Sequence, residues 1–201
     1  KIALIGANGS GKSTFLNLLD GLIFPDRGTV AFRGRELTED ALREEAFSVD
    51  FRKSVGLVFQ NPDVQLFCPT VREDIAFGPL QLGVAEEEVR QRLESVAASL
   101  KIADLLDRSP HQLSVGEKRK VAVATVLAIE PDVLLLDEPT AGLDPRTTTH
   151  LIEMLVAASH AGRTVITATH DLHVIEDIAD KVYVFGQDKR LPASGRPAAR
   201  P

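Results

Sequence analysis

GANGSGKST (residues 6–14) follows the apolar run IALI (2–5) and precedes the helix-forming stretch FLNLLDGL (15–22). The stretch contains the pattern Gly-x-x-x-x-Gly-Lys-Ser at Gly6, Gly11, Lys12 and Ser13. Glycines let successive backbone N–H groups converge on phosphate oxygens, and the helix that starts near Lys12 adds the positive end of its dipole. The pattern therefore predicts a phosphate-binding loop; a glycine-rich turn without a ligand is the alternative.

Two side chains of this loop have expected roles. In a loop of this type the lysine reaches the β and γ phosphates of a nucleotide, and the hydroxyl group ligates Mg²⁺. Lys12 and Ser13 stand at these positions. The candidate nucleotide-binding residues of the loop are Asn8, Gly9, Ser10, Gly11, Lys12, Ser13 and Thr14.

The composition excludes several classes of protein. The chain has 201 residues, 29 acidic against 23 basic, and a formal charge of −6, so binding of nucleic acid or of an anionic membrane through net positive charge is not expected. The single cysteine, Cys68, excludes an internal disulfide, and we assign it no role. No window reaches the roughly 18 apolar residues needed to span a bilayer, and the N-terminus shows no signal-peptide pattern. Any connection with a membrane is therefore expected to pass through a protein partner.

Short runs of branched apolar residues alternate with helix-length segments. The runs are IALI (2–5), VGLVF (55–59), VLLL (133–136), VITAT (165–169) and VYVF (182–185). Such uninterrupted runs are typical of a parallel sheet that is covered on both faces. GTVAFR (28–33) indicates a short strand of a small antiparallel flap. The sequence thus predicts an α/β fold with a parallel sheet core and a small antiparallel flap.

One segment, 68–120, interrupts this alternation with helical patterns and no convincing strand, which indicates an inserted α-helical subdomain. We expect a discontinuous core of residues 1–67 and 121–191 around it. Residues 192–201 carry no periodicity, and we expect a flexible tail there. Within the core, Asp144 as N-cap and Pro145 as first helical residue predict the start of a helix that Gly162 ends.

Two adjacent carboxylates end the strand in LLLDEP (134–139). In open parallel sheets, ligands bind at the carboxyl ends of the strands. Asp137 is suited to bind Mg²⁺ through a water molecule. Glu138 is suited to orient or deprotonate the water that attacks a γ phosphate. For an Asp-Glu pair taken alone, a helix cap or a solvated turn is the alternative.

Gln60 and His170 follow two further predicted strands, so their side chains are expected at the same edge of the sheet. Gln60 is placed to contact the metal and the lytic water, and His170 to donate to the γ phosphate. Taken singly, each also fits a capping or solvent-facing role. The catalytic candidates are Glu138, His170 and Gln60, and the metal-ligand candidates are Ser13, Gln60 and Asp137.

A second anion-binding helix start is predicted in LSVGEKRKVAVATVLA (113–128), where a Ser-x-Gly turn opens a helix. A single chain folded around one nucleotide has no evident use for it. In a symmetric dimer, the turn that contains Ser114 and Gly116 closes over the nucleotide held by the other subunit.

The chain resembles the ATP-binding cassette (ABC) ATPases over essentially its whole length. The resemblance rests on stretches in this order: GANGSGKST, Gln60, LSVGE (113–117), LLLDEP, AGLDP (141–145) and THD (169–171). It implies a P-loop NTPase with a RecA-like core, ATP and Mg²⁺ as ligands, ATP hydrolysis and a nucleotide-sandwich dimer. In that dimer Ser114 and Gly116 act on the partner's nucleotide, and Asp144 lies at the seam.

VGLVFQNPDVQLFCPTVREDIAFGP (55–79) is similar to the ATPases of energy-coupling factor (ECF) importers and of cobalt and nickel importers. The similarity implies a peripheral subunit on the cytoplasmic face of the cell membrane that powers uptake of a metal ion or vitamin. Its implied partners are a transmembrane coupling subunit and a second ATPase, identical or related, with no nucleic acid. Candidates for the partner-facing surface are Asn61, Pro62, Asp63, Gln65, Leu66 and Phe67, although Leu66, Phe67 and Phe77 also fit packing of the helical insert against the core.

The sequence departs from the family pattern in the signature turn. Val115 and Glu117 replace a glycine and a glutamine of the usual LSGGQ. A β-branched residue disfavours positive φ, and a carboxylate repels a phosphate unless it is paired, so both changes bear on the contact with the partner's nucleotide. The aromatic residue on which the family stacks adenine is expected upstream of Lys1. A soluble ABC ATPase that acts on a macromolecule is the alternative function, and the acidic balance counts against it.

Overall fold

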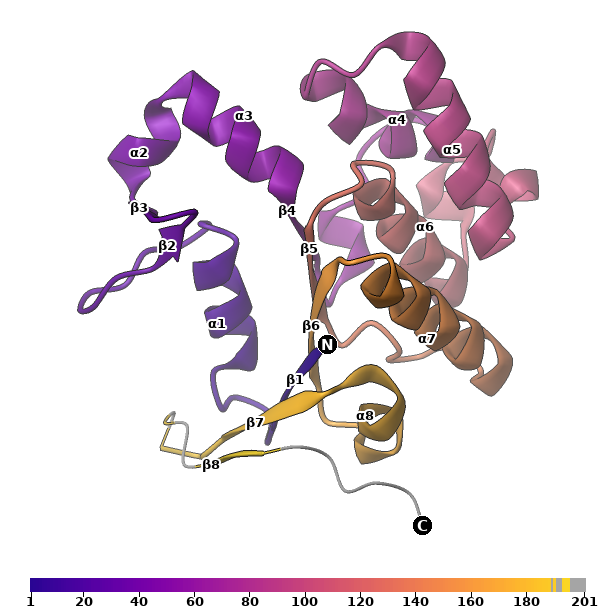
Figure 1. Ribbon diagram of the computed structural model, residues 1–201. Coiled ribbons are helices and arrows are strands. Elements are labelled where there is room, and N and C mark those ends of the chain that lie inside the picture. Colours follow the sequence, from indigo (N-terminus) through magenta and orange to yellow (C-terminus); the bar gives the residue numbers. More distant parts are fainter. Residues whose placement is uncertain (189, 191–192, 196–201) are drawn as a thin grey trace.

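The computed structural model describes residues 1–188, 190 and 193–195. Within them, a six-stranded sheet has the strand order β4-β5-β6-β1-β7-β8 (Figure 1). The strands are β1 (Ile2–Gly6), β4 (Val55–Val58), β5 (Val133–Asp137), β6 (Thr164–Thr169), β7 (Lys181–Phe185) and β8 (Ala193–Gly195). All pairings are parallel except that of β7 with β8. The five apolar runs of the sequence therefore form one parallel sheet, as predicted.

Helices cover both faces of this sheet, because its strands are apolar on both sides (Figure 1). The helices α1 to α3 lie on one side, and α4 to α8 lie on the other. The helices are α1 (Lys12–Leu19), α2 (Glu39–Arg43), α3 (Glu45–Ser54), α4 (Val71–Gln81), α5 (Glu86–Leu100), α6 (Val115–Leu127), α7 (Pro145–His160) and α8 (Leu172–Ile178), with short 3-10 turns η1 (Pro62–Val64), η2 (Ala103–Leu105) and η3 (Pro110–Gln112).

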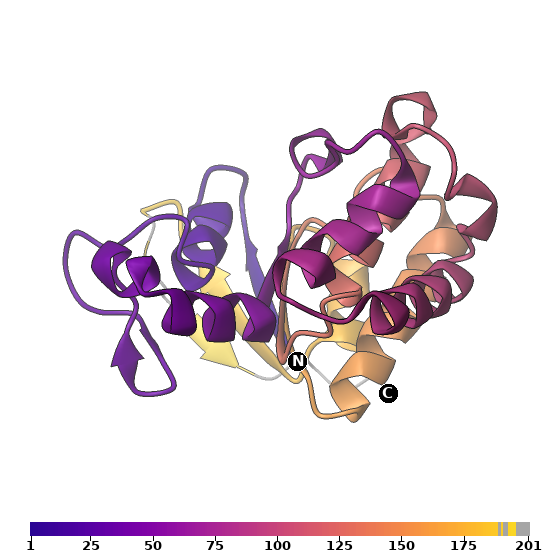
Figure 2. The ribbon, with the colours of Figure 1, turned by 90° about the horizontal axis from the view of Figure 1, so that it is seen from above.

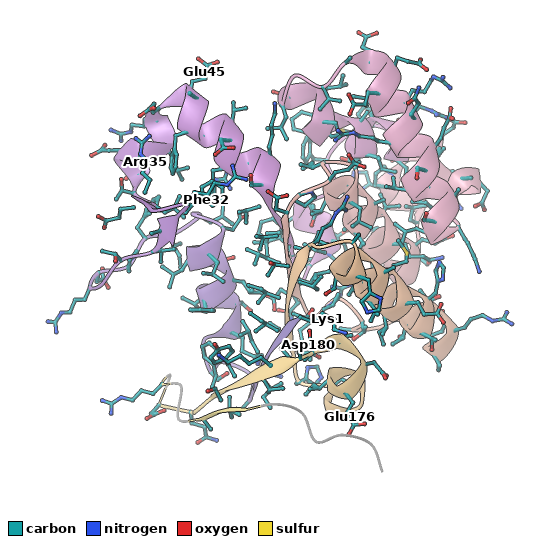
Figure 3. The ribbon with its side chains drawn as sticks, in the orientation of Figure 1. Lys1, Phe32, Arg35, Glu45, Glu176 and Asp180 are labelled. Carbon is teal, nitrogen blue, oxygen red and sulfur yellow. The ribbon has the colours of Figure 1, made fainter. Side chains whose placement is uncertain are left out.

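The predicted flap is an antiparallel hairpin of β2 (Ala31–Phe32) and β3 (Arg35–Glu36). Its two-residue loop, Arg33 and Gly34, has positive φ at both positions, as a type I′ turn requires. Figure 2 shows the hairpin at the end of the molecule opposite the helical insert. Phe32, labelled in Figure 3, packs edge-to-face on Phe51 of α3 with ring centroids 5.2 Å apart, which ties the flap to the core.

The segment 68–120 is helical and contains no strand, as predicted. Leu93 and Leu100 of α5 are buried on the expected apolar face, and the partly buried Val96 packs beside them. The expected boundary at residue 120 lies inside α6, which begins within the segment and ends at Leu127. One continuous helix therefore joins the insert to the parallel sheet.

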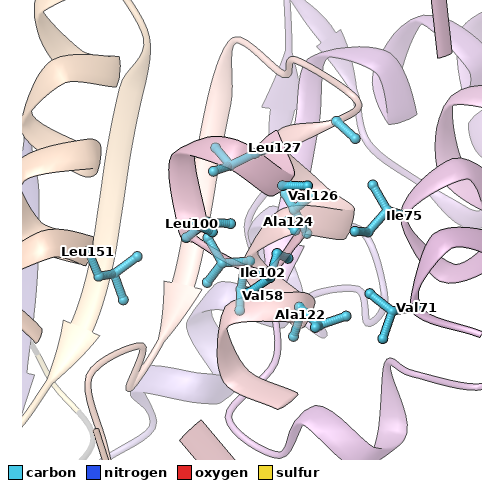
Figure 4. Close-up of a cluster of buried hydrophobic side chains, with 14 of the residues drawn as sticks. Val58, Val71, Ile75, Leu100, Ile102, Ala122, Ala124, Val126, Leu127 and Leu151 are labelled. Atoms are coloured by element: carbon cyan, nitrogen blue, oxygen red, sulfur yellow. The ribbon is translucent and has the colours of Figure 1, made fainter. Parts of the chain in front are cut away.

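The insert and the sheet share one hydrophobic core. Figure 4 shows Val58 of β4, Ile75 of α4 and Leu100 of α5 gathered around α6. Leu134 and Leu136 of β5 belong to the same cluster of buried side chains. Because packed cores are dense, a shift of α6 displaces its neighbours on both sides.

The end of the chain differs from the predicted tail. Ala193–Gly195 pairs with β7 as strand β8, which covers part of the edge that β7 otherwise exposes. The remaining residues of that prediction, 192 and 196–201, lie outside the described residues. At the other end, the amino group of Lys1 donates to Asp180 Oδ2 at 2.8 Å, and Figure 3 shows the two residues together. No helix in the described part of the chain combines the length and the hydropathy required to cross a membrane.

Candidate nucleotide-binding site

A pocket of about 620 Å³ lies at the carboxyl ends of β1, β4 and β5. It is lined by Asn8, Gly9, Ser10, Gly11, Lys12, Ser13, Thr14, Phe15, Leu18, Gln60, Asp137, Glu138 and Phe185. All seven loop residues predicted to bind a nucleotide are in this set, together with Gln60 and both carboxylates. Strand ends that are distant in the chain therefore meet around one cavity, as the sheet topology requires.

The loop conformation depends on glycine at two positions. A Cβ on Gly6 would lie 2.6 Å from the carbonyl oxygen of Phe185, so no larger residue fits between β1 and β7. Gly11 caps α1 with φ 105°, a conformation that residues with a side chain rarely adopt. Gly11 has no side chain that could accept from the first N–H groups of α1, which leaves this cap open to an anion at the positive end of the helix dipole.

Lys12 lies inside the curve of the loop. Its Nζ donates to the carbonyl oxygens of Gly6 and Ala7 at 2.8 and 3.1 Å, and the residue is only 6% exposed. The loop itself thus holds the ammonium group next to the pocket, so that a phosphate entering the pocket meets a positive charge that is already in place.

Asp137 ends β5 as a buried carboxylate. Its Oδ1 has no hydrogen-bond partner among the described residues. Burial raises the pKa of this carboxyl group and Glu138 raises it further, while a hydrogen bond from Ser13 and the charges of Lys12 and Arg119 lower it. A buried carboxylate oxygen without a partner is rare in folded proteins unless a ligand or ion completes it.

Glu138 is 5% exposed and is held at both carboxylate oxygens. Oε1 lies 2.8 Å from His170 Nδ1, and Oε2 accepts a bond from the Thr169 hydroxyl at 3.3 Å. His170 itself is not among the residues that line the pocket, and its side chain is 61% exposed. The structure therefore brings His170 to the site through Glu138, with Nδ1 engaged in that contact.

The signature turn lies outside this pocket. The Ser114 backbone N–H and hydroxyl both donate to Glu117 Oε2 at 2.7 Å, and the Glu117 N–H donates back to the hydroxyl, which makes a capping box at the start of α6. These hydrogen bonds hold the pKa of the Glu117 carboxyl group below its usual value. Val115 is the first residue of α6 and does not have positive φ, so it introduces no backbone strain.

Arg119 contacts the site although it was not among the residues predicted from the sequence. This residue is 5% exposed, and its Nη1 donates to the carbonyl oxygen of Glu138 at 3.1 Å. Residues 119, 122, 123 and 126 have the spacing of one helix face, and the other three are buried and apolar. An arginine on an otherwise apolar helix face could have indicated a contact with the site, because a buried charge in a protein needs a partner.

Three of the predicted partner-facing residues point inward instead. Gln65 Nε2 donates to Ala122 O and to Thr125 Oγ1, each at 2.8 Å, and its Oε1 accepts from the Phe59 N–H. Pro62 and Leu66 are buried as well. The prediction was wrong for these three side chains because their hydrogen bonds and apolar contacts are needed to join the segment to α6.

Large apolar side chains are exposed on this segment and on α4, which follows it. Phe67 is 64% exposed, and its ring packs edge-to-face on Phe77 with centroids 5.0 Å apart. Val64 and Leu80 are also large and exposed. We call these four residues the apolar patch. Asp63, another predicted residue, is exposed and binds Lys118 at 2.6 Å.

Comparison with known proteins agrees with this geometry. Residues 1–141 match the family model described as ABC transporter. The chain is 50% identical over 202 residues to the nickel import ATP-binding protein NikO of Rhodobacter capsulatus, covering 99% of this chain and 79% of that protein. It is 43% identical over 190 residues to the energy-coupling factor transporter ATP-binding protein EcfA of Methanocaldococcus jannaschii, covering 94% and 67%.

Solved structures show the same fold. CbiO1 of Clostridium perfringens, described as part of the ABC transporter complex cbiONQ, has a TM-score of 0.81 and 37% identity, with 98% of this chain and 76% of that chain covered. The ATP-binding cassette MJ0796, a dimer in a post-hydrolysis state with ADP and Pi, has a TM-score of 0.86 and 25% identity, with 99% and 86% covered. The predicted P-loop fold and the resemblance are confirmed: this chain belongs to the ABC transporter ATP-binding family and is an ATPase.

Proposed function

We propose that this chain is the ATP-hydrolysing subunit of an ECF or cobalt/nickel type importer and that ATP-driven closure of a dimer powers uptake of a metal ion or vitamin. The observation that carries the proposal is the meeting of Lys12, Gln60, Asp137 and Glu138 at one pocket. The similarity to NikO, EcfA and CbiO1 supports the importer class. In this assignment the chain is peripheral, on the cytoplasmic face of the cell membrane, and binds a transmembrane coupling subunit.

The residues of the pocket divide the work of hydrolysis. The N–H groups of the loop and the Lys12 ammonium hold the phosphates and offset the charge that develops as the γ phosphate leaves. Glu138 orients or deprotonates the attacking water, and Gln60 contacts that water from the neighbouring strand. His170 holds one Glu138 oxygen at 2.8 Å, so we assign it the orientation of this carboxylate as well as the expected approach to the γ phosphate.

Mg²⁺ fits the donor set of the pocket. The unpartnered Oδ1 of Asp137 and the Ser13 hydroxyl beside it are oxygen donors, and Gln60 adds an amide oxygen. Mg²⁺ is commonly bound by one or two carboxylates plus substrate phosphates. Bound there, the ion would neutralise charge on the phosphate oxygens.

The signature turn acts in trans in this proposal. Ser114 and Gly116 contact the nucleotide of the second subunit, identical or related, and Asp144 lies at the seam. Two observations support this arrangement. The turn is absent from the lining of its own pocket, and the MJ0796 cassette is described as a dimer.

Glu138→Gln tests the assignment. The change keeps the shape of the side chain and removes its basicity, so we expect ATP binding to persist while turnover falls by about 10²-fold or more and a closed dimer accumulates. Turnover is measured by phosphate release, and the dimer by size-exclusion chromatography with ATP. Glu45→Gln, on the exposed start of α3, is the matched control and should leave both unchanged. Wild-type turnover of Glu138→Gln would remove Glu138 from the mechanism.

A further inference from the structure

Arg119 connects the helix of the signature turn to the carboxylate of its own site. It lies in the second turn of α6, five residues after Ser114. Its Nη1 donates to the carbonyl oxygen of Glu138 at 3.1 Å, and the residue is 5% exposed. Its Nε has no partner among the described residues, so the guanidinium is buried with a hydrogen bond at Nη1 and none at Nε.

The backbone of Glu138 is in a conformation that needs support. Its φ of 49° lies in the left-handed region, which residues other than glycine rarely adopt. Its N–H donates to Ala168 O at 2.9 Å, and its carbonyl oxygen accepts from the Ala141 N–H at 3.2 Å as well as from Arg119. Such conformations persist where the surroundings fix them from several sides, and they concentrate at functional sites.

We infer that Arg119 is a positioning residue for Glu138: its hydrogen bond holds the Glu138 peptide so that the carboxylate faces the pocket. The inference rests on the proposed function, because it acts through Glu138. Since Arg119 and the Ser114 turn share α6, this bond connects a movement of that helix on dimer closure with the Glu138 peptide, in addition to the core contacts of α6 with β5. The competing role is charge balance alone, in which the guanidinium only offsets Asp137 and Glu138.

The first experiment compares Arg119→Met with Arg92→Met in the complete purified protein. Arg92 also donates from Nη1 to backbone carbonyl oxygens, those of Ala128 and Ile129, but far from the pocket, and is therefore a matched control. For Arg119→Met we expect kcat to fall about tenfold, the effect of one lost positioning hydrogen bond, with KM and ATP affinity unchanged. Arg92→Met should keep the wild-type kcat. Wild-type turnover of Arg119→Met would overturn the inference.

The second experiment repeats Arg119→Met in the Glu138→Gln background. If Arg119 acts through Glu138, the residual rate of the double variant equals that of Glu138→Gln alone. The same tenfold loss in both backgrounds would contradict the inference and leave the proposed function intact. Failure of the proposed function is seen separately, as wild-type turnover of Glu138→Gln.

Arg119→Lys separates the hydrogen bond from the charge and replaces Arg119→Met if that variant does not fold. Lysine keeps the positive charge, but it is shorter and lacks the planar guanidinium that reaches the Glu138 carbonyl oxygen, so we expect kcat to fall about fivefold. Charge balance alone predicts the wild-type kcat for this variant, and that result would overturn the inference. Melting temperatures of all variants are recorded so that rates are compared where each is folded.

Discussion

Several charged side chains near the pocket are buried, and each is held by specific contacts. Lys12 donates to two loop carbonyl oxygens, and both oxygens of Glu138 have partners. Among the described residues, Asp137 Oδ1 and Arg119 Nε have no hydrogen-bond partner. At the scale of the residue, Lys12 and Glu138 are therefore held in place by contacts within the chain itself.

Asp20 makes the stability of the fold depend on pH. It caps the end of α1, and burial raises the pKa of its carboxyl group to about 6 from 3.8, although Arg52 opposes the shift with a bond to Oδ2 at 3.2 Å. Between pH 3.8 and about pH 6, Asp20 is protonated in the folded protein and ionised in the unfolded chain. The contribution of Asp20 is therefore full below pH 4 and is lost as the pH rises to about 6, a change of about 2–3 kcal/mol.

Asp20→Asn should remove this pH dependence while keeping an oxygen for Arg52. Relative to that of the wild type, the free energy of unfolding of the variant should rise by about 2–3 kcal/mol between pH 4 and pH 7. Urea unfolding at both pH values measures the difference. Asp26→Asn, in the exposed loop that follows, should track the wild type. Parallel curves for Asp20→Asn and the wild type would show that Asp20 ionises in the folded protein as in the unfolded chain.

The start of α6 is the element on which the proposed trans contact depends. The capping box occupies the Ser114 hydroxyl, which donates to Glu117. Arg108 lies 3.8 Å from the same carboxylate, which is too far for a close pair. Glu117 thus stabilises the helix start and, in the same position, presents a negative charge next to the turn expected to meet a phosphate.

Substitutions of Glu117 separate these two effects. Glu117→Ala should lower the free energy of unfolding by about 1 kcal/mol because the Ser114 N–H loses its partner, whereas Glu117→Gln keeps an acceptor and should cost less than about 0.5 kcal/mol. Without the charge, Glu117→Gln should also form the ATP-dependent dimer at a lower ATP concentration. Chemical unfolding and light scattering measure the two quantities.

The capping box of α4, made by Thr70 and Glu73, provides the control. Glu73→Ala should reproduce the loss of stability, and Glu73→Gln should leave the dimer unchanged, because this helix start is on the insert and not at the signature turn. If Glu117→Gln forms the dimer at the same ATP concentration as the wild type, the carboxylate does not oppose the trans contact.

At the scale of the whole molecule, the shared core makes the helical insert and the sheet one packed body. The nucleotide pocket lies at the strand ends, and the apolar patch lies on α4 of the insert and on the segment that leads from β4 to it. Exposed apolar side chains that gather in one place commonly mark a protein interface. A partner bound at the patch would thus be connected through α6 and its core contacts with the pocket.

Phe67→Asp tests the patch as the binding surface for the transmembrane subunit. A carboxylate buried in an apolar interface without a partner costs several kcal/mol, so we expect the chain to be lost from the detergent-solubilised complex on affinity purification. The turnover of the isolated chain should stay within about twofold, because Phe67 does not line the pocket. Phe24→Asp, an exposed phenylalanine after α1, is the control. Retention of Phe67→Asp in the complex would place the interface elsewhere.

Neighbouring residues were sufficient to predict the five parallel strands, the phosphate loop and the N-cap of α7. The Asp144 side chain accepts from the N–H groups of Arg146 and Thr147, as its place before Pro145 indicates. Glycine turns, helix caps and the periodic spacing of apolar residues each depend on residues that lie close together in the chain. A single stretch of sequence therefore contains all the groups involved. Parallel strand order then brings the polar residues that follow the strands to one edge.

Only the tertiary structure decided which polar residues turn inward. Arg119 reaches Glu138 across 19 positions and Gln65 reaches Ala122 across 57, and β8 exists because β7 offers it an open edge. The left-handed backbone of Glu138 likewise depends on Ala168 and Arg119. The sequence by itself determined the local elements and the motifs, while these contacts required the folded chain, because a buried polar group is stable only where a distant partner completes its hydrogen bonds.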